Sequence, residues 1–349
     1  MPVAAFYKKN LRCQTTNGVE PLTKNLAVSQ LGPLATVICI CHNHEGYVVE
    51  ALQSVIEQCY TNIELIVIDN GSTDLSVERI HEFVEKHPTV RFIRNLTNQG
   101  LNRAFNQGLA LARGQYIIDL SADDVLLPYR VARQVSALEQ LPNSYGVVFS
   151  NAAYVDANGR ETGYHYPIDL NGRAWSVVPV GDVFIPVLAS YFICTPTMLI
   201  RREVLTELGG YDETLAYEDF DFWVRSARRY QYAYVDEVLT HKRQLAGSLS
   251  TQVTLSNNPL LATTLAVCRK AFALCHNDDE RAALAIRLRA CIRKAFYAEQ
   301  FDLAMQFGTL HHQIAKPNAL TRLVLRLSRL RIRVNTIYRW YVRCRTKQV

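Results

Sequence analysis

Two adjacent carboxylates follow a strand-like run in the segment QYIIDLSADDVLLP, residues 115–128. The Tyr-Ile-Ile run favours a buried strand, and Asp123 and Asp124 stand where that strand ends. Like charges this close raise a pKa or lower stability unless a neighbouring group neutralises them. These residue types at this spacing therefore predict a neutralising partner beside the pair.

Regular alternation of strand and helix patterns surrounds the carboxylate pair. Strand patterns occur at 36–41, 64–69, 90–95, 115–120 and 145–155, with helix patterns at 48–59, near 80–84, at 104–113 and from 128 to about 140. Such alternation predicts an α/β fold with right-handed crossovers and a mostly parallel, covered sheet. The polar clusters HNHEG, DNGSTD, NLTNQG and SADD follow the first four strands. Ligands of such sheets bind beyond the carboxyl ends of the strands, so we expect these clusters to meet at one edge.

The pattern changes after Asp156. Residues 157–195 have no regular period, and "YEDFDFWVRSARRY" then predicts a helix with acids in its first turn. Helical patterns follow at 258–275, 278–296 and 298–314. We therefore expect a leader at 1–34, an α/β domain at 35–255 and a C-terminal helical region at 256–349.

Composition excludes several classes of protein. Hydrophobic residues make up 49% and charged residues 20% of the 349 residues, values typical of a folded chain. Apolar runs are strand-sized, the N-terminus lacks a secretory signal pattern, and the nine cysteines form no C-x-x-C. These features predict a reducing cytoplasmic setting. A dehydrogenase is disfavoured because no G-x-G-x-x-G follows the first strand.

Positive charge is concentrated in the C-terminal tail. Residues 321–349 hold eight Arg and one Lys with no acid; without these nine, 29 basic residues face 32 acidic ones, a net charge of −3 against +6 for the whole chain. Leu323, Leu327, Leu330 and Val334 recur at helical spacing beside arginines, which predicts an amphipathic helix on an anionic membrane surface. Packing of this stripe on the preceding helices is the alternative, and no recognised nucleic-acid-binding module accompanies the arginines.

Three ordered blocks resemble the family 2 glycosyltransferases. They are "VICICHNHEGYVVEALQSVIEQCYTNIELIVIDNGSTD", "NLTNQGLNRAFNQGLALARGQYIIDLSADD" and "GGYDETLAYEDFDFWVR". The resemblance covers roughly residues 35–250 and implies the GT-A fold, a Rossmann-like, nucleotide-diphospho-sugar transferase fold, here followed by a C-terminal helical extension. The implied activity is an inverting, metal-dependent transfer of a sugar from a nucleotide-sugar to an acceptor hydroxyl.

The resemblance implies a nucleotide site at the sheet edge. Asp69 and Asn70 would lie beside the base, with Asn70 where many members have Asp, which favours UDP. His42 would pack on the base or be an ordinary loop-edge histidine. The other implied nucleotide-binding residues are Cys41, Asn43, Glu45, Asn98, Gly100, Arg103, Asp123 and Arg243. Turn and helix-capping chemistry is the alternative explanation of DNGSTD and NLTNQG.

The resemblance also implies that a divalent cation neutralises the carboxylate pair. Asp123 and Asp124, with His241 nearby, would hold Mg²⁺ or Mn²⁺, which prefer hard oxygen ligands and leave positions open for phosphate oxygens. This chain has Ser121 where the family usually has Asp, so the metal would depend more on Asp124 and on the substrate phosphates.

The third block implies the catalytic base. Asp219 would take the proton of the acceptor hydroxyl, and Glu218 would support it or touch the acceptor. Acids that merely stabilise a helix N-terminus are the alternative. The resemblance further implies a glycan acceptor, free or lipid-linked, in bacterial surface polysaccharide synthesis (lipopolysaccharide, O-antigen or capsule) at the inner face of the cell membrane. The rival functions are a non-catalytic nucleotide- or sugar-binding homologue and a sugar nucleotidyltransferase.

Overall fold

The computed structural model describes residues 32–217, 219–245 and 259–335. Residues 33–349 form one compact unit and residues 1–32 another, and every described helix and strand belongs to the larger unit. Its strands are β1 (Ala35–Cys41), β2 (Ile63–Asn70), β3 (Arg91–Asn95), β4 (Tyr116–Ser121), β5 (Val125–Leu126), β6 (Tyr145–Val155), β7 (Glu161–Tyr164), β8 (Leu199–Arg201) and β9 (Gln231–Arg243). Its helices are α2 (Val48–Ile56), α3 (Ser76–Lys86), α4 (Leu101–Leu109), α5 (Arg130–Glu139), α6 (Phe184–Ala189), α7 (Arg202–Leu208), α8 (Asp219–Ala227), α9 (Leu260–Leu274), α10 (Asp278–Tyr297), α11 (Phe301–Ile314) and α12 (Ala319–Arg329), with a 3-10 turn at Thr195–Thr197.

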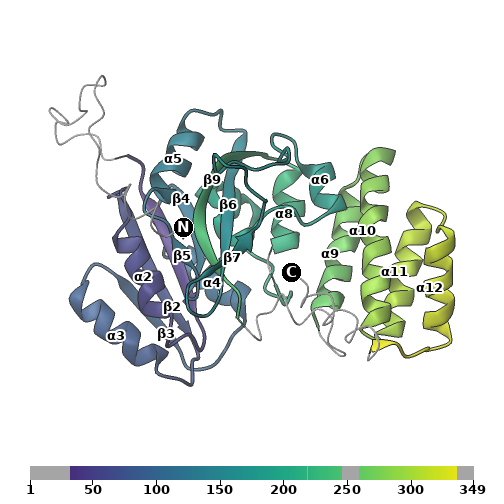
Figure 1. The fold of residues 1–349 in the computed structure, drawn as a ribbon, viewed down its shortest axis with the longest axis horizontal. Coiled ribbons are helices and arrows are strands. Elements are labelled where there is room, and N and C mark those ends of the chain that lie inside the picture. Colours follow the sequence, from purple (N-terminus) through teal and green to yellow (C-terminus); the bar gives the residue numbers. More distant parts are fainter. Residues whose placement is uncertain (1–31, 218, 246–258, 336–349) are drawn as a thin grey trace. The chain divides into compact units, whose positions relative to one another are not determined.

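One nine-stranded sheet organises the α/β part (Figure 1). The strand order is β3-β2-β1-β4-β8-β6-β9-β5, and β7 pairs with β6. The first four strands of this order are parallel, and β6 is parallel to β9, whereas β8 runs antiparallel to β4 and β6. The predicted α/β sheet is therefore confirmed, and the reversed strand β8 joins its two parallel portions.

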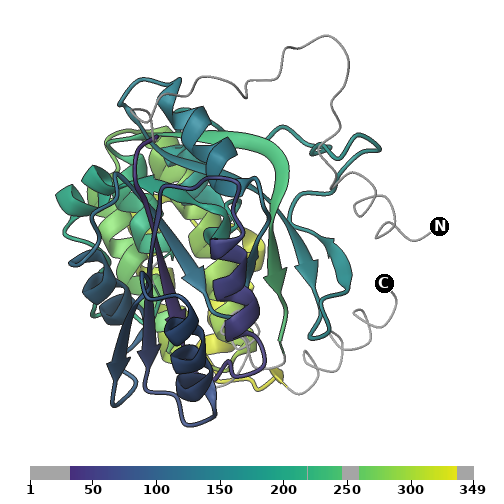
Figure 2. The ribbon, with the colours of Figure 1, turned by 90° about the vertical axis from the view of Figure 1, so that its left-hand side faces the viewer.

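Successive side chains of β1 point to opposite faces of the sheet, and apolar residues on both faces are buried. Val37 and Cys39 belong to one apolar core, with residues of α2, α3 and α5, and Ile38 and Ile40 belong to the other. The second core continues without interruption into the helical region, where it includes Leu265 of α9 and further residues of α10 and α11. Figure 2 shows the helices that cover the two faces.

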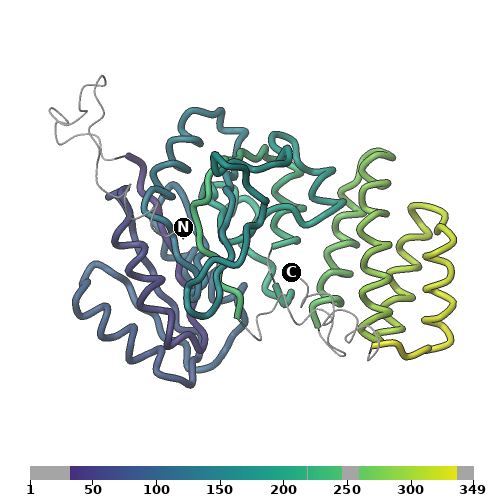
Figure 3. The backbone as a smooth tube through the Cα atoms, in the orientation of Figure 1, coloured from purple at the N-terminus to yellow at the C-terminus, as the bar shows by residue number. Residues whose placement is uncertain are grey.

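The C-terminal helices pack side by side. Helix α10 contacts α9, α11 and α12, as Figure 3 shows. Helices α10 and α12 begin at asparagines whose side chains accept a first-turn N–H, from Glu280 to Asn277 and from Thr321 to Asn318, both at 2.9 Å. In the described ranges no helix combines the length and the hydrophobicity needed to span a membrane. The predicted domain boundary near residue 255 lies outside the described residues and stays a prediction.

Two differences from the predicted elements bear on the site. Helix α4 begins at Leu101 rather than Ala104 and ends at Leu109, where a tighter turn from Leu111 N to Gly108 O (3.0 Å) closes it. Helix α6 and the short strand β5 occupy segments that have no clear pattern in the sequence. Both are held by tertiary contacts: β5 pairs with β9, and α6 packs on α8 and α10.

Candidate active site

The loop after β1 is fastened to the turn after β2 through Asn43 and Glu45, two residues predicted to bind nucleotide. Asn43 N donates to Ser72 Oγ (2.9 Å), and Asn43 Oδ1 accepts from Thr73 N (2.8 Å). Glu45 N donates to Asp74 Oδ2 (3.0 Å). Asn43 itself has a φ of 57°, a value that asparagine tolerates better than most residues. The two clusters therefore meet at one sheet edge, as expected, and brace each other.

Asp69 presents an unused acceptor at this edge. Its Oδ2 accepts from Gly71 N (3.2 Å) and Ser72 N (3.1 Å), while its buried Oδ1 has no hydrogen-bond partner among the described residues. His42 Nδ1 is likewise buried without a partner there. A buried polar atom without a partner costs free energy, so a ligand N–H reaching Asp69 Oδ1 would be favoured. Cys41, also buried, has its pKa raised to about 11 by burial and is a neutral thiol.

Asn70 braces the neighbouring loop. Its Nδ2 donates to Asn98 Oδ1 (3.2 Å) and Gly100 O (3.3 Å), and its Oδ1 accepts from Gln99 N (3.1 Å). The next residue, Gly71, has a φ of +76°, and a Cβ there would lie 2.4 Å from the Thr97 carbonyl carbon. Only glycine allows this close approach of the loops, which fixes the cluster 95–100 against the end of β2.

Helix α4 joins the second and third sequence blocks. Asn106 Nδ2 donates to Tyr211 O (2.8 Å), and Asn106 Oδ1 accepts from Tyr211 N (2.9 Å). Phe105, where the family often has Arg, is buried and stacked on Tyr211 at 4.1 Å between centroids. Arg103 is exposed, with its Nε 4.0 Å from Glu213 Oε2. The helix therefore holds the loop that leads toward Asp219.

The carboxylate pair has two different environments. Asp123 is half-buried, and its Oδ1 accepts from Ser121 Oγ (2.5 Å). Asp124 is only 4% exposed, and its Oδ1 accepts from Arg243 N (2.8 Å). Burial, followed by the Asp123 charge, raises the pKa of Asp124 to about 7. The like-charge problem predicted from the sequence is thus present in the structure.

Arg243 and His241 flank the pair without completing a metal site. Arg243 is buried: its Nη2 lies 2.7 Å from Glu50 Oε2, its Nε donates to Asp123 O (3.0 Å), and its guanidinium stacks over the Tyr47 ring at 4.7 Å. His241 Nε2 lies 3.8 Å from Glu161 Oε1 on β7. No three His, Cys, Asp or Glu side chains within residues 32–217, 219–245 and 259–335 are grouped so as to hold a metal ion. The protein ligands gathered here are therefore two carboxylates.

Asp219 opens α8 on another side of the site. Its Oδ1 accepts from Phe220 N (2.5 Å), and Thr195 Oγ1 donates to its Oδ2 (3.5 Å). Burial raises the pKa of Asp219 to about 6, against the lowering effects of the Phe220 N–H and of the Lys242 and Arg287 charges. A carboxylate with this pKa is ionised at neutral pH and basic enough to accept a proton. Glu218 lies outside the described residues.

Lys242 connects the two acidic groups, and we did not predict it from the sequence. Its ammonium charge acts on Asp124 and on Asp219, and these charges in turn help to raise its pKa. From the sequence, surface charge was one interpretation of Lys242, which lies between His241 and Arg243. Pairing with β6 and β5 places β9 beside the carboxylate pair, and that pairing could not be read from local pattern. Lys242 is thus a cation close enough to the carboxylate pair and to Asp219 to act on both.

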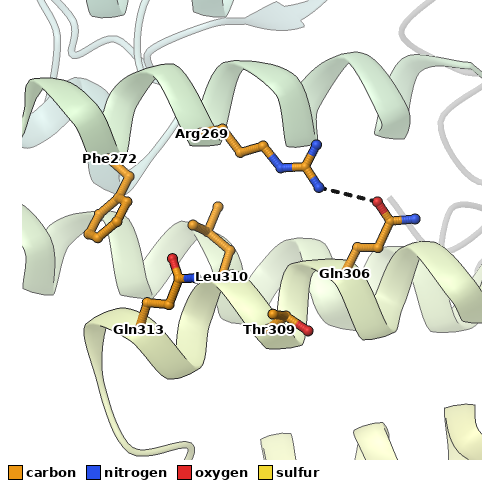
Figure 4. A pocket seen from close by; sticks show the side chains of 6 residues that line it. All are labelled: Arg269, Phe272, Gln306, Thr309, Leu310 and Gln313. Atoms are coloured by element: carbon orange, nitrogen blue, oxygen red, sulfur yellow. Dashed lines mark hydrogen bonds between the residues drawn. The ribbon is translucent and has the colours of Figure 1, made fainter.

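One cavity lies away from these carboxylates. A cavity of about 370 Å³ between α9 and α11 is lined by Arg269, Phe272, Gln306, Thr309, Leu310 and Gln313 (Figure 4). It contains none of the carboxylates described above, and its facing polar groups, Arg269 Nη2 and Gln306 Oε1, bond to each other at 3.3 Å. The chemistry of the molecule is therefore concentrated at the sheet edge.

The chain matches one known protein family and several curated relatives. Residues 36–209, about half of the chain, match the family described as Glycosyl transferase family 2. An uncharacterized glycosyltransferase of Methanocaldococcus jannaschii is 27% identical over 214 residues, which are 60% of this chain and 71% of the relative. In eight of the matching relatives the matched region covers between 29% and 71% of their length, so much of several of them has no counterpart here.

Solved structures show the same fold. The crystal structure of S. aureus TarS 1-349 in complex with UDP-GlcNAc superposes with a TM-score of 0.64 at 16% identity, covering 85% of this chain and 88% of that one. The mannosyltransferase PcManGT from Pyrobaculum calidifontis, in complex with GDP-Man and Mn²⁺, gives 0.53 at 17% identity, covering 86% and 85%. The predicted GT-A fold with a helical C-terminal region is confirmed.

Proposed function

Because the chain belongs to glycosyl transferase family 2, we propose that it transfers a sugar from a nucleotide-sugar, most simply a UDP-sugar, to an acceptor hydroxyl with inversion at the anomeric carbon. The observation that supports this proposal is the buried carboxylate of Asp219, which, like that of Asp124, lies close enough to the Lys242 ammonium to be influenced by its charge. A base on one side and a binding site for negative charge on the other are what a single displacement needs.

The transfer follows from these positions. Asp219 accepts the proton of the acceptor hydroxyl as that oxygen forms a bond to the anomeric carbon. The bond from the anomeric carbon to the diphosphate oxygen breaks on the opposite side, and its electron pair leaves with the nucleoside diphosphate. Lys242 stabilises the negative charge that develops there. Asp69, with its unused Oδ1, would accept an N–H of the base.

We further propose a divalent cation at the carboxylate pair. Asp123 and Asp124 supply hard oxygens, and the buried, repelled Asp124 is a carboxylate that a cation would stabilise. Mg²⁺ or Mn²⁺ bound there would supply charge stabilisation to the departing diphosphate. PcManGT was solved with Mn²⁺, which agrees with this choice. His241 as a further ligand stays a prediction.

The outward face of α12 supports a membrane-associated acceptor. The helix packs on its neighbours through Thr321, Val324 and Ser328, which are buried. Leu320, Leu323 and Leu330 are 53%, 52% and 69% exposed, beside three exposed arginines, Arg322, Arg326 and Arg329. An apolar stripe beside cations suits an anionic bilayer surface. Of the predicted stripe, Leu323 and Leu330 are exposed, whereas Leu327 and Val334 are partly buried against the apolar core, so the stripe packs in part. Residues 336–349 of the predicted tail lie outside the described residues.

We accordingly propose a cytoplasmic enzyme at the inner face of a bacterial membrane. There it would extend a lipid-linked glycan during surface polysaccharide synthesis. The chain would consist of the α/β domain predicted at 35–255 and the helical region predicted at 256–349. Glu218 would assist at the acceptor side, and Arg103, Asn98 and Gly100 would border the donor.

The decisive experiment is a transfer assay on Asp219→Asn beside a donor-binding assay. The amide keeps the size of the carboxylate but cannot accept the proton, so transfer should fall by about 10²–10⁴-fold while donor affinity is kept. Asn158→Asp, a change on an exposed loop, serves as a control for a change in charge. Wild-type transfer by Asp219→Asn would refute the assignment of the base, and loss of donor binding by that variant would refute a role confined to the acceptor side.

A further inference from the structure

Helix α9, which lies beyond the region matched by the family, holds the loop before Asp219. Thr263 Oγ1 accepts from Ala216 N at 3.1 Å. Thr264 Oγ1 and the Tyr217 hydroxyl lie 2.6 Å apart in a hydrogen bond. The last described residues before α8 are therefore attached to α9, and any shift of that helix would be transmitted to the start of α8.

Helix α10 supplies a buried cation, Arg287, to the start of α8. Arg287 is 3% exposed, and its Nε and Nη2 donate to the carbonyls of Leu188 (2.8 Å) and Val187 (2.6 Å) near the end of α6. Its guanidinium carbon lies 3.9 Å from the centre of the Phe220 ring and 4.3 Å from that of Tyr191. The charge is thus stacked against the residue that directly follows Asp219.

This arrangement uses the particular chemistry of arginine. A planar guanidinium can stack on a ring and donate in its plane at the same time, whereas a lysine ammonium is a point charge. The bonds to α6 fix the guanidinium in place, and its position fixes Phe220. In this orientation Arg287 connects α6 to the first turn of α8.

The groups around Asp219 come from several elements. Lys242 of β9 and Arg287 of α10 both favour the ionised carboxylate, as do the Phe220 N–H and the Thr195 hydroxyl. The hydroxyls of Tyr191 and Tyr217 lie close enough for the Asp219 charge to raise their pKa values. Removal of one cation from this partly buried set should make the carboxylate easier to protonate.

We propose that Arg287 is a positioning residue for sugar transfer: from the C-terminal helical region it holds Asp219 in place and in its ionised form. This inference rests on the proposed function, in which Asp219 is the base. It makes the helical region a part of the active site.

The test is the pH profile of kcat at saturating UDP-sugar and Mn²⁺, in full-length Arg287→Met and Arg287→Lys. Because protonated Asp219 is inactive, activity should fall as pH falls, and without the cation this fall should begin at higher pH. We expect the acidic limb of Arg287→Met to move up by about 0.5–1 pH unit, and that of Arg287→Lys to move less. All rates are taken below the lowest Tm of the set, so that both variants are folded when measured.

Arg228→Met is the matched control. Arg228 also links to α10 and α6, with Nη1 2.7 Å from Glu280 Oε1 and its guanidinium 4.5 Å from the centre of the Phe184 ring. Its loss should lower Tm and leave the acidic limb in place. An unmoved limb in Arg287→Met, or an equal movement in Arg228→Met, would overturn the proposal. Asp219→Asn in the same series separates the two hypotheses, since wild-type transfer by that variant would refute the base itself, whatever Arg287 does.

Discussion

Replacement of Asp124 by Asn should stabilise the metal-free protein at alkaline pH. Asp124 is buried, and its folded-state pKa is raised from the ordinary value of 3.8 to about 7, first by burial and then by the Asp123 charge. The amide has the same shape, and its Oδ1 can still accept from Arg243 N. The substitution therefore removes a buried charge and retains the hydrogen bond.

The size of the effect follows from the pKa. A rise of this size corresponds to about 4 kcal/mol of unfolding free energy, because each pH unit is worth about 1.36 kcal/mol. A carboxyl whose folded-state pKa is raised destabilises the protein when ionised, so wild-type stability falls as pH rises from about 4 to about 7. At about 2.1 cal/mol/K of unfolding entropy per residue, 4 kcal/mol is about 5 °C in Tm for a chain of this length.

Thermal denaturation at pH 5 and pH 8 in EDTA measures the effect. Asp124→Asn should melt about 5 °C above wild type at pH 8, with a smaller difference at pH 5. Asp123→Asn is the matched control, and it should show a smaller gain, because burial rather than Asp123 is the first cause of the raised pKa. With Mn²⁺ and UDP added, wild type should gain stability and Asp124→Asn should not. Equal or lower Tm of Asp124→Asn at pH 8 would refute the picture of an unneutralised buried charge.

Two further predictions concern cations. Lys242→Met should lower kcat/KM for transfer by about 10²-fold, because it removes the charge that we propose stabilises the departing diphosphate, and Lys242→Arg should retain most of the activity. Steady-state kinetics with both variants checks this, and an unchanged rate in Lys242→Met would refute the proposed role of the lysine. Replacement of Arg322, Arg326 and Arg329 by Gln should weaken binding to anionic vesicles by about 100-fold, because each charge contributes about 1 kcal/mol. Vesicle sedimentation measures this, with neutral vesicles as control, and equal binding of the wild type and the variant would contradict the proposed membrane surface on α12.

The sequence was most informative where local pattern and function coincide. The strands at 36–41 and 64–69 are nearly continuous apolar runs, as a sheet covered on both faces requires, and the polar clusters that follow them do meet at one edge. Asp123 and Asp124 were recognisable as a candidate site because two adjacent acids after a strand repel each other and lower the stability of the fold unless another group neutralises them. The family, the fold and the class of activity could all be predicted from such features.

The residues missed are those whose role depends on distant elements. Arg243 was predicted to bind the nucleotide, which stays a prediction, but nothing in the sequence showed that its buried side chain pairs with Glu50, almost 200 positions earlier in the chain. Lys242 appeared to be surface charge because nothing local shows that β9 lies beside β5. Arg287 is one arginine in a basic helix until the position of Phe220 is known. Side-chain partners of this kind are set by tertiary pairing, which a single sequence does not reveal.

The uninterrupted apolar core has a consequence for protein engineering. Residues of the sheet, of α8 and of α9–α11 share that core, and Lys270 of α9 pairs with Asp221 of α8 at 2.7 Å. A chimera that takes its donor-binding half from one homologue and its helices from another would have to match both the core and this ion pair. The exchangeable module is therefore larger than the α/β domain: a productive graft should carry α8, α9 and α10 together, and its junction belongs before Asp219.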